Sequence, residues 1–187
     1  SIAPEISVLV LALLIIMVEL TITRRDDVLQ IIVIIGLAVT MAITLLTTGG
    51  DGTAFNGMIA HDGVGTFMKL LLTGVTLLAV LVSRDYLVGN VIRQGEYYAI
   101  LLLATCGMMF LSSATNLITL FLGVETMSIA LYVLAGSNPE KPRSSEAALK
   151  YFLLGAFSTG FLLYGMALVY GGTGGMTNLY EISIAIA

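Results

Sequence analysis

Two long apolar segments that follow one another along the chain constrain the fold more than any other feature. Residues 117–135 and 145–170 consist almost entirely of apolar and small side chains, and a short charged turn, SNPEKPR, separates them. About 20 apolar residues in an α-helix cross the hydrocarbon core of a bilayer. These runs are too long and too continuous for the strands of a membrane barrel. Because 58% of the residues are hydrophobic and only 11% are charged, the composition indicates a helical integral membrane protein.

The same pattern recurs along the chain and predicts an all-α, polytopic bundle of about six transmembrane helices. We treat the whole chain, 1–187, as one transmembrane domain, in which residues 176–187 begin a further element. Gly and polar residues concentrate in the segment 48–65, which predicts a loop with a short hairpin. Mixed charges at 84–95 predict a loop or an interfacial turn. The expected spans are 3–22, 28–47, 66–82, 97–113, 117–135 and 145–170.

Basic residues in the connecting segments predict the orientation of the bundle. Lys and Arg occur after the first, third and fifth expected spans and are absent after the second, fourth and sixth. Positively charged loops remain on the cytoplasmic side of a membrane. We therefore expect the N-terminus on the outer, periplasmic side of a bacterial inner (plasma) membrane, in preference to an organellar inner or thylakoid membrane. The residues that set this orientation are Arg24, Arg25, Arg84, Arg93, Lys141 and Arg143.

Glu125 is the most informative single residue, because it lies near the middle of the fifth expected span. An ionisable side chain within the membrane is costly and usually marks a proton or ion path. Ser128 and Tyr132 share its helix face and could hold the carboxylate or a chain of waters. The alternative is a structural carboxylate that bonds to a neighbouring helix.

Lys150 lies little more than one turn inside the sixth expected span. Its side chain could extend back to the interface or pair with Glu146, four residues earlier. The functional alternative is a relay lysine that faces Glu125 or a lysine on another helix.

Lys69 lies in the first turn of the third expected span, near the outer interface. We interpret it mainly as a lysine that extends toward the interface, with a proton-carrying role as the alternative. Glu5 is expected to complement the positive end of the first helix. Glu19 is expected to pair with the basic pair Arg24 and Arg25 at the end of that helix.

Several classes of function find no support in the sequence. The chain contains no phosphate-binding Gly loop, no dinucleotide fingerprint, no metal-ligand cluster and no nucleophile triad. We therefore predict no catalytic, cofactor-binding or metal-binding residue in this chain. Cys106, the single cysteine, is expected to be a buried core residue, and His61 is expected to be a surface group. Small residues on the sixth span, spaced as Ala156 and Gly160 are, predict close helix packing.

Two stretches, taken together, resemble a known family. They are GEYYAILLLATCGMMFLSSATNLITLFLGVETMSIALYVLAG and RSSEAALKYFLLGAFSTGFLLYGMALVYGGTG, with HDGVGTFMKLLL and LVSRDYL before them. They resemble the antiporter-like membrane subunits of the proton-pumping NADH–quinone oxidoreductase, respiratory complex I, and within that group subunit N, also called subunit 2. The resemblance implies that the chain corresponds to the N-terminal part of an antiporter-like fold.

The resemblance also implies a function for the charged residues. The glutamate of the fifth helix maps onto Glu125, and the lysines of the sixth and third helices map onto Lys150 and Lys69. In the family such residues form a charged axis that couples quinone reduction to proton translocation. Further lysines lie on later helices. The chain itself would hold no redox cofactor, while the complex uses NADH, FMN, iron–sulfur clusters and quinone. Its partners would be neighbouring membrane-arm subunits and the lipid bilayer, with no nucleic acid.

Two other functions remain open from the sequence. The same fold and charged residues suit a subunit of an Mrp-type cation/proton antiporter complex. A non-catalytic membrane scaffold subunit is the second alternative.

Overall fold

The computed structural model describes residues 2–21, 26–47, 52–90, 92–138 and 140–186, and within these ranges it is an almost entirely helical protein. Six of its helices are long and apolar enough to cross a membrane, which confirms the predicted fold class. A seventh, shorter helix and a two-stranded hairpin complete the described elements. The elements are α1 (Ala3–Thr21), α2 (Asp26–Leu46), β1 (Gly52–Ala54), β2 (Ile59–His61), α3 (Gly63–Gly89), α4 (Gln94–Ser112), α5 (Leu117–Ala135), α6 (Pro142–Gly172) and α7 (Leu179–Ile186).

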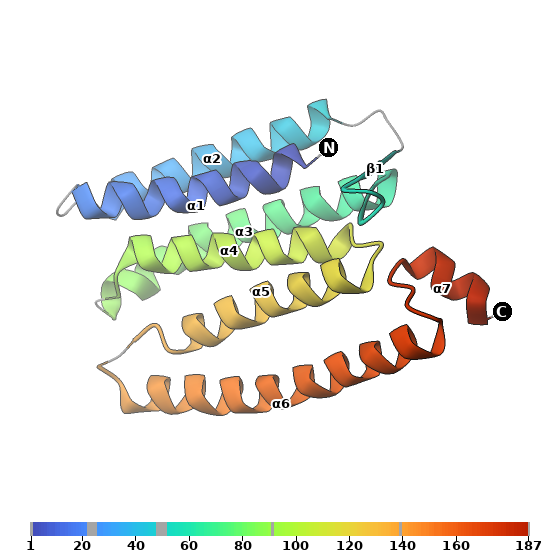
Figure 1. Cartoon of the computed structure of the whole chain (residues 1–187). Helices are drawn as coiled ribbons and strands as arrows, with labels where there is room; N and C mark the ends of the chain where they lie inside the picture. The colour runs from blue at the N-terminus through green and yellow to red at the C-terminus, as the bar shows by residue number, and fades with distance from the viewer. Residues whose placement is uncertain (1, 22–25, 48–51, 91, 139, 187) are drawn as a thin grey trace.

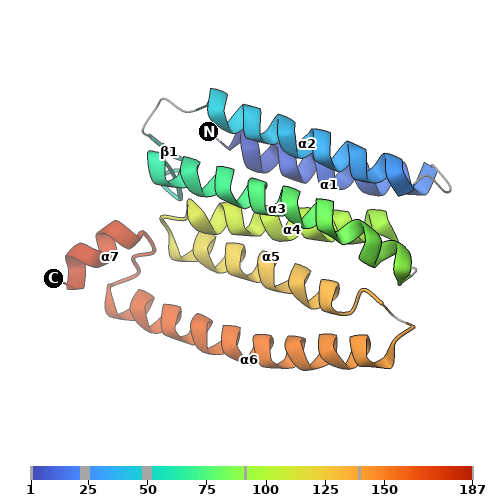
Figure 2. The same cartoon turned by 180° about the vertical axis from the view of Figure 1, so that it is seen from behind.

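The six long helices lie side by side and alternate in direction. Figure 1 shows α1 and α2 at one edge of the bundle, α3 and α4 next to them, then α5, and α6 at the opposite edge. The N-terminus, β1 and α7 lie at one end of the bundle, while the α3–α4 and α5–α6 links lie at the other end. The reverse view in Figure 2 shows the same order, with α3 between α2 and α4. The α3–α4 and α5–α6 links contain Arg93 and Lys141, so these basic residues share one end.

The apolar core lies among α1, α2, α3 and α4. Val8 and Ile15 of α1, Leu37 of α2, and Leu102 and Met109 of α4 are fully buried within it. By contrast, α6 has no buried residue, and its main contact among the long helices is with α5. The bundle therefore consists of a well-packed group of four helices, extended by α5 and then by a largely uncovered α6.

A small layer of extended backbone ties three connecting segments together at the end that holds the N-terminus. β1 and β2 pair antiparallel, as the predicted hairpin requires. The Thr115 N–H donates to Met58 O at 3.1 Å, and the Leu179 N–H donates to Thr115 O at 2.9 Å. Asn116 caps α5 through its side chain, which accepts the Ile118 N–H at 2.9 Å. The α4–α5 link is thus held between the hairpin and the start of α7, and this fixes where α5 begins.

Two local expectations differ from the structure. The segment expected to be a loop from residue 84 is helical up to Gly89, because charged side chains are tolerated in the last turns of a helix, and Asn90 follows as the C-cap. The close helix packing expected at Ala156 and Gly160 is absent from the described residues. Nothing lies within 4 Å of a Cβ built on Gly160. Cys106 is a buried free cysteine, as predicted.

Candidate functional site

Glu125 occupies the middle of α5 and is half-buried. One of its carboxylate oxygens, Oε1, is buried and has no hydrogen-bond partner among the described residues. A buried polar atom without a partner carries a free-energy cost of about 1–3 kcal/mol. The position therefore has the features of a site that a proton, a water or a group from outside the described chain would complete.

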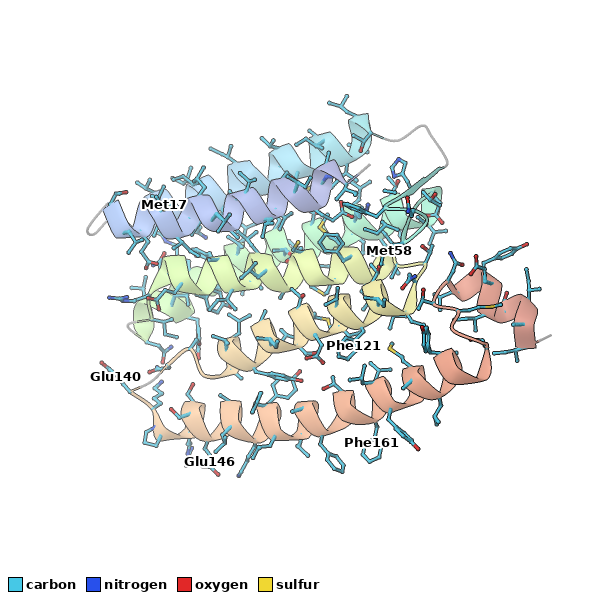
Figure 3. All side chains as sticks on the ribbon, in the orientation of Figure 1. Met17, Met58, Phe121, Glu140, Glu146 and Phe161 are labelled. Atoms are coloured by element: carbon cyan, nitrogen blue, oxygen red, sulfur yellow. The ribbon has the colours of Figure 1, made fainter. Side chains whose placement is uncertain are left out.

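The helix face that carries Glu125 turns toward α6. Tyr132, two turns further along α5, packs its ring edge-to-face on Tyr151 at 4.9 Å and on Phe152 at 5.9 Å between centroids. Phe121, one turn before Glu125, lies between α5 and α6 in Figure 3. Glu125 shares this face by helical spacing. The hydroxyls of Ser128 and Tyr132, which by their sequence positions could hold the carboxylate or a chain of waters, make no hydrogen bond to the carboxylate in the described structure.

Lys150 lies on α6 and does not reach Glu125 in the described structure. Its Nζ lies 2.5 Å from Oε1 of Glu146, and both side chains are largely exposed, at 69% and 62%. Lys150 and Glu146 thus form the ion pair between residues one turn apart that the sequence predicted as one alternative for Lys150. The described residues therefore do not bring Lys150 and Glu125 together.

Lys69 and Glu5 form an ion pair inside the four-helix core. Lys69 Nζ lies 2.7 Å from Glu5 Oε1, and the two side chains are 3% and 0% exposed. The expected extension of Lys69 to the interface is wrong, because a carboxylate from α1 meets the ammonium within the bundle. Glu5 also lies in the first turn of α1, where its charge suits the helix dipole.

The buried face of α3 that carries Lys69 is polar along much of its length. Thr73 donates to Lys69 O at 2.6 Å, and Thr76 shares a hydrogen bond of 2.8 Å with Thr105 of α4. Thr66, one turn before Lys69, is also buried. This stripe recurs at helical spacing, so the hydroxyls face the same neighbours as the ammonium does.

Sequence reasoning did not identify Glu5 as the partner of Lys69. The available signal was weak. Both residues lie near the outer ends of their spans and thus at similar depth, and an intramembrane charge needs a partner. The sequence offers no means of deciding that α1 and α3 are neighbours.

At the opposite end of the bundle, Glu19 holds the start of α4. Its carboxylate accepts the backbone N–H groups of Gly95 and Glu96. This satisfies donors that the first turn of a helix leaves free. The expected partners Arg24 and Arg25 lie outside the described residues.

Nearby, Arg93 donates to Glu96 at 2.6 Å, and this hydrogen bond raises the pKa of the guanidinium above its ordinary value.

The described residues contain no cluster of the side chains that most often bind metal ions. No group of three or more His, Cys, Asp or Glu side chains within them is arranged to hold one.

His61 Nε2 lies 2.9 Å from Thr47 O, so this half-buried ring links β2 to the end of α2.

Comparison with known proteins defines the class of this chain. The family described as NADH:quinone oxidoreductase/Mrp antiporter, TM, matches residues 114–186, which include α5, α6 and Glu125. Together with a subunit N relative that is 44% identical over 92% of this chain, this match shows that the chain belongs to the antiporter-like family of membrane subunits.

Several similar proteins are subunit N of NADH-quinone oxidoreductase. Subunit N 1 from Herpetosiphon aurantiacus is 44% identical over 92% of this chain, which spans only 35% of that relative. A chain of respiratory complex I from Thermus thermophilus has a TM-score of 0.75 and 33% identity, with 93% of this chain and 38% of that chain covered. A chain of the archaeal membrane-bound sulfane sulfur reductase shares the fold, at a TM-score of 0.81 and 20% identity, over 97% of this chain and 39% of that one. The chain thus spans little more than a third of these proteins.

Proposed function

We propose that this chain is part of a membrane-arm subunit of a proton-translocating NADH–quinone oxidoreductase, in which Glu125 carries protons. The observation that supports the proposal most is the buried Oε1 of Glu125, which lies in the middle of α5 without a hydrogen-bond partner in the described chain. The identity to subunit N proteins over most of the chain supports the choice of complex.

The chemistry follows from the surroundings of a carboxylate in hydrocarbon. A low-dielectric medium disfavours the charged form of an isolated acid, and a nearby cation favours it. A carboxyl group whose cationic neighbour moves or changes charge therefore takes up and releases a proton. Lys150 pairs with Glu146 and is not that neighbour in the described structure. We assign the role to a lysine elsewhere in the complete subunit, as the family resemblance implies.

The remaining members of the complex would perform the redox chemistry. NADH, FMN, iron–sulfur clusters and quinone belong to the complex as a whole, and this chain contributes proton handling through Glu125, Lys150 and Lys69. Neighbouring antiporter-like and small hydrophobic subunits would be its partners. The chain would lie in a bacterial inner membrane with its N-terminus on the outer side.

The test is Glu125→Gln in the complete complex, reconstituted into sealed vesicles. Proton uptake and NADH oxidation are measured together. We expect a strong loss of protons moved per NADH, because Gln keeps the shape of the side chain but cannot ionise. Glu140→Gln, which alters an exposed turn residue, is the matched control and should pump normally. Normal pumping by Glu125→Gln would contradict the proposal.

An Mrp-type cation/proton antiporter subunit is the second candidate, since the matching family description includes both kinds of complex. Purification of the complex that contains this chain discriminates between the two. Flavin and iron–sulfur absorbance that co-purifies with the chain favours the oxidoreductase. Sodium-dependent proton exchange without such cofactors favours the antiporter.

A further inference from the structure

We propose that Glu5 accepts a transferred proton while Lys69 remains its ion-pair partner, and that the two residues form a second protonatable site between α1 and α3. The site is separate from Glu125, which faces α6. The inference rests on the proposed function, because it assigns a role in proton handling to a residue that neither the sequence pattern nor the comparisons single out.

The geometry gives Glu5 a free acceptor. Its Oε1 lies 2.7 Å from Lys69 Nζ in an ion pair, and neither buried carboxylate oxygen has a hydrogen-bond partner among the described residues. The side chain is fully buried. A carboxylate can accept several hydrogen bonds, so one oxygen engaged by an ammonium leaves capacity on the other.

Two polar side chains donate hydrogen bonds to the backbone of the pair. The Cys106 thiol of α4 donates to Glu5 O at 3.8 Å, and Thr73 of α3 donates to Lys69 O at 2.6 Å. Ser7, two residues further along α1 than Glu5, shares a hydrogen bond of 2.8 Å with Thr40 of α2. These bonds hold the backbone around the pair, while Oε2 of Glu5 has no partner among the described residues and remains as an acceptor for a proton.

The proton balance of the site is simple. In the resting pair Lys69 is an ammonium and Glu5 is a carboxylate, so the net charge is zero. A proton that arrives forms an O–H bond on Glu5 Oε2, and the pair then carries one positive charge. Loss of that proton breaks the O–H bond and restores the neutral pair. Because an uncompensated charge is costly in the core, the loaded state favours release.

A purely structural tie between α1 and α3 is the competing explanation. A buried ion pair contributes little net stability, and apolar or neutral replacement of both partners is often neutral or stabilising. Removal of one partner alone leaves an unpaired buried charge and is strongly destabilising. A double neutral variant therefore separates the two explanations, since it keeps the fold while it removes the proton site.

The experiment compares Glu5→Gln with the double variant Glu5→Gln/Lys69→Met in the complete reconstituted complex. We expect the double variant to assemble and to oxidise NADH, with a loss of protons moved per NADH. Glu5→Asp keeps the carboxylate and should restore pumping in part. Thr21→Ala, which removes an exposed hydroxyl at the other end of α1, should pump normally. If the Glu5→Gln complex does not assemble, the double variant and Glu5→Asp still test whether Glu5 carries protons or only joins α1 to α3.

Infrared difference spectra between the oxidised and reduced complex provide a readout that a structural tie would not change. A protonated-carboxyl band that is lost in Glu5→Gln but retained in Glu125→Gln would support the site. Full pumping by the assembled double variant would overturn it. If that variant pumps normally while Glu125→Gln does not, only the Glu5 site fails. Normal pumping by Glu125→Gln counts against the proposed function instead.

Discussion

Gly107 of α4 and Gly123 of α5 lie against each other so closely that neither position has room for a side chain. A Cβ on Gly107 would lie 2.6 Å from Met127 N, and a Cβ on Gly123 would lie 2.9 Å from Leu111 N. Both contacts are with backbone, which cannot rotate away. The two glycines therefore set the distance between α4 and α5, and so the position of the helix that carries Glu125.

Replacement of either glycine by alanine should push α5 away from α4. We expect Gly107→Ala and Gly123→Ala to lower the free energy of unfolding by about 1–3 kcal/mol, as overpacking does. Thermal unfolding in detergent measures the loss. Gly160→Ala is the matched control, because its Cβ would meet nothing within 4 Å. Equal unfolding temperatures for Gly123→Ala and Gly160→Ala would contradict the prediction.

The contact between α5 and α6 depends on a different glycine. A Cβ on Gly155 would lie 1.8 Å from the Tyr132 hydroxyl. We expect Gly155→Ala to displace the Tyr132 ring from α6, because no side chain fits beneath it. Tyrosine fluorescence and cross-linking of cysteines placed at Ser128 and Phe152 would report the change. Gly165→Ala, with nothing within 4 Å of the new methyl group, should leave both signals unaltered.

The ion pair of Lys150 with Glu146 should contribute less to proton pumping than Glu125 does. Because both members are exposed and one turn apart, Lys150→Ala should reduce proton pumping less than Glu125→Gln does. Glu146→Gln, which removes the partner and keeps the lysine, separates loss of the pair from loss of the cation. Pumping that is lower in Lys150→Ala than in Glu125→Gln would reverse the order of importance that we assign.

The hydrogen bond between Thr76 and Thr105 should stabilise the packing of α3 on α4. Thr105→Val keeps the shape and removes the hydroxyl, so we expect a loss of about 1 kcal/mol in the free energy of unfolding. Thr105→Ser keeps the hydroxyl and should therefore retain most of the free energy of unfolding of the unmodified protein. An unfolding temperature for Thr105→Val equal to that of the unmodified protein would show that the bond contributes nothing.

The predicted orientation can be tested with cysteines at the two ends of the bundle. In a Cys106→Ala background, Asn56→Cys in the hairpin should react with a membrane-impermeant maleimide from outside intact cells. Glu140→Cys, in the α5–α6 link, should react only after the membrane is opened. Both residues are exposed, so access to solvent does not differ between them. The reverse labelling pattern would invert the orientation.

The sequence predicted the elements of the fold because burial in a membrane imposes simple rules. Apolar runs of sufficient length determined the six long helices, and a polar, Gly-rich segment determined the hairpin. The sequence also singled out Glu125, because an acid in the middle of an apolar run is rare. It did not predict how far α3 continues, since polar residues such as Arg84 and Asp85 are tolerated in the last turns of a helix that leaves the bilayer.

What the sequence by itself determined is therefore which residues enter the membrane and which of them carry charge. Only the tertiary structure decided which charges meet. Lys69 meets Glu5 because α1 and α3 pack in the same core, and Lys150 turns to Glu146 and away from Glu125. Likewise, the Glu19 carboxylate accepts backbone N–H groups at the start of α4 because α1 packs beside α4. Helix periodicity specifies the face on which a side chain lies, but the neighbour of that face depends on contacts between helices far apart in the chain.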